Sequence, residues 1–163
     1  MFEKFGEFDS AEEMNELADN MYNEGDMEGI RALGKENGLE DVTINMYIDG
    51  YEPVFVEADE AAVGKIEVEA MELKPEDIMA DWAEYIKVSC YEDRDMAIAV
   101  RRKGKTLKAC IGELLKYAFK HQRVVDGDII KAAGVKGGRV TLGMPGRAQA
   151  QKIIRGYYLG GGK

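Results

Sequence analysis

The chain is poor in the residues that most often carry catalysis and metal binding. Its 163 residues include one histidine, His121, and two serines, Ser10 and Ser89. No nucleophile therefore has a visible base, and no Cys/His/Asp cluster has the spacing of a metal site. The carboxylates are too numerous and too scattered to single out an acid–base pair. The sequence thus predicts no enzymatic activity, no cofactor and no bound metal.

Cysteines and long apolar runs are scarce as well. Cys90 and Cys110 both lie in apolar helical contexts, which is typical of buried thiols in a reducing compartment, and a disulfide between them is the alternative. No apolar run approaches the roughly 18 residues of a membrane span. The opening residues lack the basic and apolar blocks of a signal peptide. We therefore expect a soluble intracellular protein with no membrane partner.

What is present is typical of a folded helical protein. Apolar residues make up 45% of the chain and charged residues 33%, a balance found in globular domains. We expect a mainly α fold, a compact helical protein with at most a small β-sheet. Residues 1–50 read as an acidic helical module, and residues 51–163 as a mainly helical body with a basic C-terminal third.

Capping residues and apolar spacing predict most of the helices. The first is capped by Ser10, with Glu13 reaching back, and ends at Gly25. The others are expected from Asp26 to Asn37, from Asp41 to Asp49, from Pro75 to about Cys90, after the cap Thr106, from Asp126 to Gly134, and from Arg147 to Tyr158. Three segments stay open between helix and strand: 54–71, 96–100 and 135–146.

Charge is strongly divided along the chain. Residues 1–100 carry 7 basic and 28 acidic side chains, whereas residues 101–163 carry 15 basic and 3 acidic ones. Such a division says more about partners than about fold.

The basic third is predicted to bind nucleic acid, mainly through phosphates and with little sequence preference. The candidate residues are Arg101, Arg102, Lys103, Lys105, Lys108, Arg139, Arg147, Lys152 and Arg155. The alternative is that these cations pair with the acidic half inside one fold.

The acidic half has two interpretations. Exposed carboxylates on helices are commonly a solubility device, but a row of them can also imitate phosphates and occupy a partner's basic groove. The residues that would form this partner-binding face are Glu12, Glu13, Glu16, Asp19, Glu67 and Glu69.

Two segments resemble known motifs without fulfilling them. Residues 99–106, AVRRKGKT, place Ala99 where a phosphate loop needs its first glycine, although a helix start behind basic residues can still bind a phosphate. Residues 128–140 are similar to a helix-turn-helix, but glycines would open the second helix. A short helix, a glycine-rich turn and a strand over 139–142 is the favoured alternative. We expect His121 to be a solvated residue at a helix end.

Two resemblances add a biological setting. RKGKTLKACI, residues 102–111, resembles the KGKSLKGC block of PcfK-like proteins from conjugative elements, with Thr106 and Ala109 in place of Ser and Gly. The opening MFEKFGEFDSAEEMNELADNMYNEGD, the middle LKPEDIMADWAEYIK and the ending IIKAAGV…VTLGMPG…KIIRGYYLG resemble small proteins of phages and mobile elements of gut Firmicutes, a group that includes type II-A anti-CRISPR inhibitors of Cas9.

The second resemblance implies a protein of the bacterial host cytoplasm that binds the Cas9-type ribonucleoprotein and impedes its engagement with DNA. It transfers no catalytic residues. Double-stranded DNA is a further expected partner, and a DNA-binding accessory or regulatory protein of a conjugative or phage element is the alternative function.

Overall fold

The computed structural model describes residues 2–136 and 138–160, and within them the fold is mainly α, as predicted. The elements in chain order are α1 (Ala11–Glu24), α2 (Met27–Glu36), α3 (Asp41–Ile48), α4 (Ala58–Leu73), α5 (Ile78–Glu92), α6 (Arg94–Arg101), α7 (Leu107–Lys120), β1 (Arg123–Val124), α8 (Gly127–Ala132), β2 (Thr141–Leu142) and α9 (Arg147–Leu159). The two short strands form one antiparallel pair. The expected small sheet is therefore confirmed.

The N-terminal helices begin and end where their caps predict. The Ser10 side chain accepts a hydrogen bond from the Glu13 N–H, and Gly25 ends α1 in the left-handed region with φ 76°. Asp26 caps α2 by accepting from the Gly29 N–H at 2.8 Å. One detail differs from the expected capping box, because the Glu13 carboxylate accepts from the backbone N–H of Asp9 and not of Ser10.

The segments that the sequence left open are mostly helical. Residues 58–73 form α4, and residues 96–100 lie within α6. Residues 54–56 form no strand, but Asn15 pairs with both backbone groups of Val56, at 2.9 and 3.0 Å. The predicted start at Pro75 is wrong, because Asp77 has φ 50° and α5 begins at Ile78.

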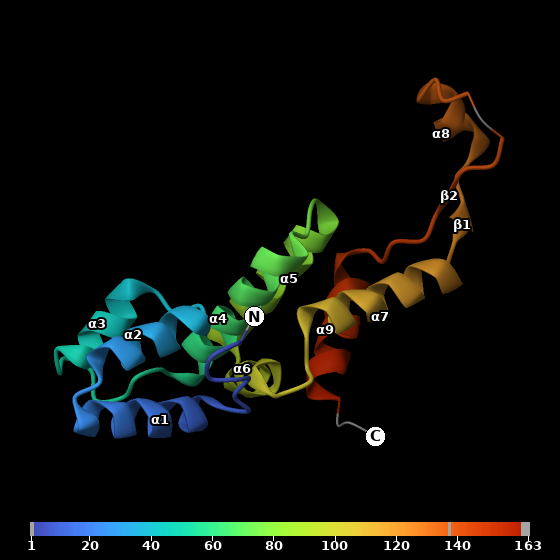
Figure 1. The fold of residues 1–163 in the computed structure, drawn as a ribbon. Helices are drawn as coiled ribbons and strands as arrows, with labels where there is room; N and C mark the ends of the chain where they lie inside the picture. The colour runs from blue at the N-terminus through green and yellow to red at the C-terminus, as the bar shows by residue number, and fades with distance from the viewer. Residues whose placement is uncertain (1, 137, 161–163) are drawn as a thin grey trace.

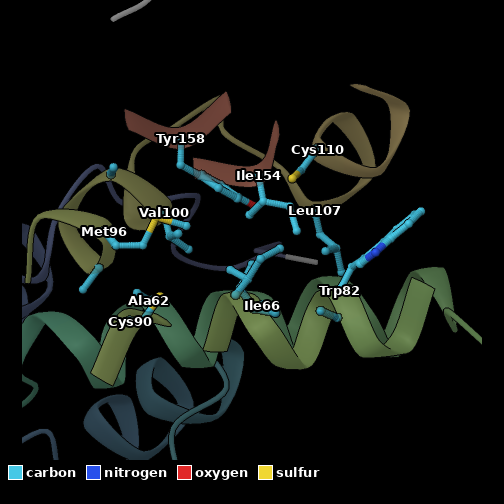
Figure 2. Close-up of a cluster of buried hydrophobic side chains, with 14 of the residues drawn as sticks. Ala62, Ile66, Trp82, Cys90, Met96, Val100, Leu107, Cys110, Ile154 and Tyr158 are labelled. Atoms are coloured by element: carbon cyan, nitrogen blue, oxygen red, sulfur yellow. The ribbon is translucent and has the colours of Figure 1, made fainter. Parts of the chain in front are cut away.

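Two clusters of buried apolar residues hold the helices together, and α4 contributes to both. The first cluster joins α1, α2 and α3 and includes Phe55 and Ala61. The second packs α4, α5, α6, α7 and α9 together and includes Ile66, Val100 and Leu107 (Figure 2). Cys90 and Cys110 are both buried and free, so the expectation of buried thiols is confirmed. Ala61 and Ala62 of α4 belong to different clusters, so α4 packs against both and connects them.

Residues 123–136 and 138–142 form an arm that stands away from the helical body (Figure 1). Its stem pairs Arg123 with Leu142 and Val124 with Thr141. None of the six residues of α8 is buried. The described residues between α8 and β2 contain no second helix, so the helix-turn-helix interpretation is wrong and the short helix, turn and strand form instead.

Candidate partner-binding surfaces

Arg101, the first predicted nucleic-acid contact, is buried. Its side chain is 1% exposed, and its Nη2 donates to the Asn37 Oδ1 at 3.0 Å. The rings of Phe2 and Phe8 lie 5.6 and 6.0 Å from the guanidinium carbon. Burial lowers the pKa of Arg101 to about 10, against the opposing influence of Glu7 and Glu69, so the side chain stays charged at neutral pH. The prediction of a phosphate contact at Arg101 is therefore wrong.

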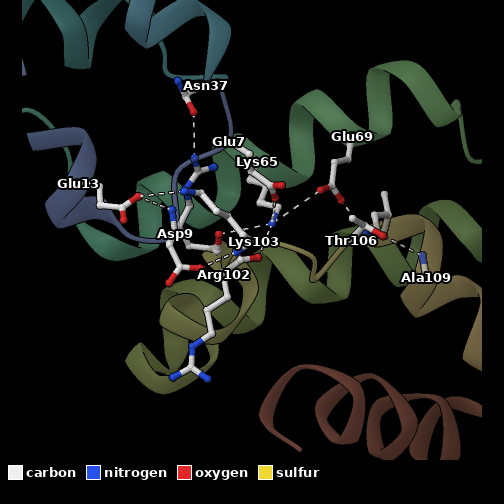
Figure 3. Close-up of polar contacts among 12 residues, drawn as sticks. Glu7, Asp9, Glu13, Asn37, Lys65, Glu69, Arg102, Lys103, Thr106 and Ala109 are labelled. Carbon is white, nitrogen blue, oxygen red and sulfur yellow. Dashed lines mark hydrogen bonds and ion pairs between the residues drawn. The ribbon is translucent and has the colours of Figure 1, made fainter. Parts of the chain in front are cut away.

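Lys65 and Glu69, one turn apart on α4, hold the backbone at the two ends of the basic loop, residues 102–106, between α6 and α7 (Figure 3). The Lys65 Nζ lies 2.7 Å from the carbonyl oxygen of Arg102 and 2.7 Å from Glu7 Oε1. The Glu69 carboxylate accepts from the backbone N–H of Leu107, the first residue of α7. A cation thus lies at the end of α6 and an anion at the start of α7, the arrangement that helix dipoles favour.

Three buried charges, Lys65, Glu69 and Arg101, form a joint together with the half-buried Glu7 and the buried Asn37. Burial lowers the pKa of Lys65 and raises the pKa of Glu69, while their opposite charges resist both shifts. Two acids and two bases balance in formal charge. Glu69 is 5% exposed, so its predicted role on a partner-binding face is wrong, and its carboxylate excludes a phosphate from the start of α7.

A close backbone approach supports the joint from the side of α2. A Cβ on Gly64 of α4 would lie 2.3 Å from the Asn37 carbonyl oxygen, and one on Gly38 would lie 2.3 Å from the Gly64 oxygen. Gly38 also has φ 74°. Two glycines therefore let the end of α2 touch α4 and bring Asn37 to Arg101.

The other predicted cations fall into two groups: those that form a hydrogen bond or ion pair within the fold, and those that are exposed to solvent. Lys105 donates through Nζ to the Tyr157 carbonyl oxygen at 2.7 Å, and Arg155 lies 2.5 Å from Asp93, whose pKa it lowers. Both are occupied within the fold. The exposed ones are Arg102, Lys103, Lys108, Arg139, Arg147 and Lys152. Of these, Lys103 also reaches back to the acidic module, with its N–H donating to Asp9 and its Nζ 3.7 Å from Glu13.

The structure adds exposed cations that the sequence prediction missed. They are Lys116, Lys120, Arg123, Lys131 and Lys136, on α7 and the arm. The spacing of Lys116 and Lys120 away from the apolar stripe of α7 already indicated exposure. For the arm there was no periodic signal, because α8 has too few residues to show one. We define the basic surface as the exposed cations of residues 101–160 that the structure describes.

The acidic surface lies at the opposite end of the molecule, on α1, α2 and α3 (Figure 1). Glu12, Glu13, Glu16 and Asp19 are exposed there as predicted sites require, although Asp19 also accepts from the Tyr47 hydroxyl at 2.6 Å. Further exposed carboxylates extend this surface: Asp9, Glu24, Asp26, Glu28, Glu40, Asp41, Asp49, Glu52 and Glu57. The last predicted member, Glu67, lies apart on α4, where it pairs with Lys87 at 2.7 Å.

An apolar groove opens between α5 and α9. Its volume is about 510 Å³, and its apolar lining includes Trp82, Tyr85, Val88, Pro145 and Ile154. Asp81 and Glu84 of α5 and Arg147 of α9 lie among the lining residues. The lining of the groove is therefore mainly apolar, with these three charged side chains among it.

Searches of the described residues found no cluster of three metal-ligating side chains and no helix long and apolar enough to cross a bilayer. Comparisons with protein-family models, with curated proteins and with solved structures found no match for this chain.

Proposed function

We propose that this protein is a non-enzymatic inhibitor of a Cas9-type nucleoprotein, encoded by a phage or another mobile element. One observation carries the proposal. The exposed carboxylates of α1, α2 and α3 lie at one end of the molecule, and the exposed cations of α7, α9 and the arm lie away from them. The two surfaces meet where Lys103 contacts Asp9 and Glu13, beside the joint. Outside this contact, both surfaces are exposed and can meet partners of opposite charge.

The acidic surface is the part that engages the effector. A Cas9-type protein holds its guide–target duplex in a positively charged channel, and the exposed carboxylates of α1, α2 and α3 carry the opposite charge. Occupation of that channel would impede entry of DNA. Because the contacts are electrostatic, binding should weaken as salt rises.

The test uses the purified effector–guide complex and three proteins. The reversal Glu12→Lys/Glu16→Lys/Glu28→Lys changes exposed side chains of α1 and α2, and the matched reversal Arg102→Glu/Lys108→Glu/Lys152→Glu changes the same number at the other end. We expect the wild type to co-elute with the complex and to suppress DNA cleavage, and the acidic-surface variant to lose both. Failure of the wild type to co-elute would reject the proposal, and loss confined to the basic-surface variant would reject the role of the acidic surface.

A DNA-binding accessory role is the second candidate, favoured by the basic surface. Between residues 101 and 160, as described, the exposed cations are accompanied by two exposed acids, Asp126 and Asp128. Titration of labelled duplex DNA at low and moderate salt tests this function. We expect binding that weakens uniformly across sequences when Arg102, Lys108 and Lys152 are reversed, and no binding at either salt would remove this candidate.

A further inference from the structure

The arm is too small to be held by its own contacts. Its stem has two residues in each strand, and α8 has six residues with none buried. Helices this short and isolated two-stranded ribbons are marginal in water. Its apolar side chains are nevertheless large and exposed, at 56% for Val124, 61% for Ile129 and 54% for Val135. Several exposed apolar side chains on one short segment of chain indicate a surface that a partner covers.

The α5–α9 groove has the complementary properties. It is lined by apolar side chains such as Trp82, Tyr85 and Val88. Around the first half of α5, exposed acids outnumber exposed cations, with Glu76, Asp77, Asp81 and Glu84 against Lys74. Glu84 also pairs with Lys87 at 2.7 Å. The arm carries the opposite charge, with Arg123, Lys131, Lys136 and Arg139 exceeding Asp126 and Asp128. The charged residues of the groove lining are Asp81, Glu84 and Arg147, so acids outnumber cations there. An apolar groove with a net acidic lining and an apolar arm with net positive charge therefore occur on the same molecule.

We propose that two copies of this chain exchange arms, so that α8 of each copy lies in the α5–α9 groove of the other. A reciprocal exchange uses the same two surfaces on both copies and closes as a two-fold dimer. The return path suits this role, because Pro145, which leads from β2 into α9, itself lines the groove. The partner is thus identified by polarity and charge together, and this inference does not rest on the proposed function.

A nucleic acid is the weaker match for the arm. Its phosphates would pair with Lys131 and Arg139, but they would leave Val124, Ile129 and Val135 uncovered. A protein groove covers both kinds of side chain. The basic surface outside the arm, which includes Lys108 and Lys152, stays available for nucleic acid in the dimer.

The first experiment measures molar mass by light scattering over a range of protein concentrations. We expect the wild type to approach the mass of two chains, and Ile129→Asp to weaken dimerisation by about tenfold or more, because a buried apolar anchor is replaced by a charge. The matched control is Val42→Asp on α3, since Val42 is 58% exposed and belongs neither to the arm nor to the lining of the groove. A wild type that stays monomeric, or equal weakening by both variants, would overturn the proposal.

The second experiment identifies the contact by disulfide trapping with oxidised glutathione. Ile129→Cys and Val88→Cys are made in separate proteins and then mixed, and the native thiols, Cys90 and Cys110, are buried. We expect a cross-linked pair in the mixture that neither single variant forms to the same extent alone. A cross-link that forms within one chain of the double variant but not in the mixture would mean that the arm folds onto its own groove. Loss of duplex DNA binding by Ile129→Asp with unchanged mass would place the arm on nucleic acid, and either result rejects arm exchange.

Discussion

Two parts of the basic C-terminal third, its start at residues 101–107 and the arm, are both rich in cations but differ in burial. At the start, Arg101 and the backbone up to Leu107 are held by Asn37, Lys65 and Glu69. At the arm, Arg123, Lys131 and Arg139 are exposed. The difference arises from residues far away in the sequence, since Arg101 and Asn37 are 64 positions apart. Charge alone therefore does not tell a structural cation from a surface cation.

Substitution of the buried Arg101 should lower stability far more than substitution of an exposed cation of the arm. Arg101→Met removes one base from a balanced buried cluster and leaves Glu7 and Glu69 with Lys65 as their single basic neighbour in the joint. We expect a loss of about 3–5 kcal/mol in the free energy of unfolding, as for other buried pairs deprived of one partner. The matched change Arg139→Met, on the exposed arm, should stay within about 0.5 kcal/mol. Urea denaturation measures both values, and equal effects would contradict the distinction.

Two helical glycines should respond to substitution by alanine with stability changes of opposite sign, because one lies at a close backbone contact and the other does not. Gly64→Ala places a methyl group against the Asn37 carbonyl oxygen, whereas Gly112→Ala on α7 meets nothing within 4 Å. We expect Gly64→Ala to destabilise the protein by about 1–3 kcal/mol, because neither backbone can easily move. Gly112→Ala should instead stabilise it by about 0.5–1 kcal/mol through helix propensity. Thermal melts of the two variants give opposite signs if the α2–α4 contact is as close as described, and a gain of stability for both would contradict it.

The helices could be predicted because their signals are local. Ser10, Asp26 and Thr106 each satisfy an N–H three residues onward, so the caps are visible in a window of four residues. The apolar stripe of α7 is likewise complete within its own length. These elements need no information from the rest of the chain.

The candidate sites could be predicted only in part, because exposure depends on distant neighbours. Glu69 and Glu12 look alike in the sequence, but Glu69 lies where α4 meets the start of α7 and is buried there. Arg102 and Arg101 are adjacent, yet they point into solvent and into the joint respectively. No period or composition signal separates the members of these pairs, since the deciding contacts are tertiary.

A buried thiol of the helical body should make the stability of the protein depend on pH in the alkaline range. Burial raises the pKa of Cys110 from its ordinary value of 9.0 to about 12, with Glu113 adding to the shift. Between these two values the folded state keeps a proton that the unfolded state has lost, so stability falls as pH rises, by about 1.4 kcal/mol per unit. Below pH 9 both states are protonated and this contribution is constant.

Cys110→Ala should therefore flatten the decline of stability above pH 9. Arg101 acts with the opposite sign, because burial lowers its pKa to about 10. Above that pH the folded state has lost a proton that the unfolded state still holds, so this contribution to stability rises with pH. This opposing contribution is common to the wild type and the variant, so the difference between their two slopes isolates the thiol. Ile129→Ala on the arm is the control and should leave the slope unchanged, since it alters no buried titrating group. Denaturant melts at closely spaced pH values measure the slopes, and an unaltered slope in Cys110→Ala would mean that the thiol is not shielded from water as its burial requires.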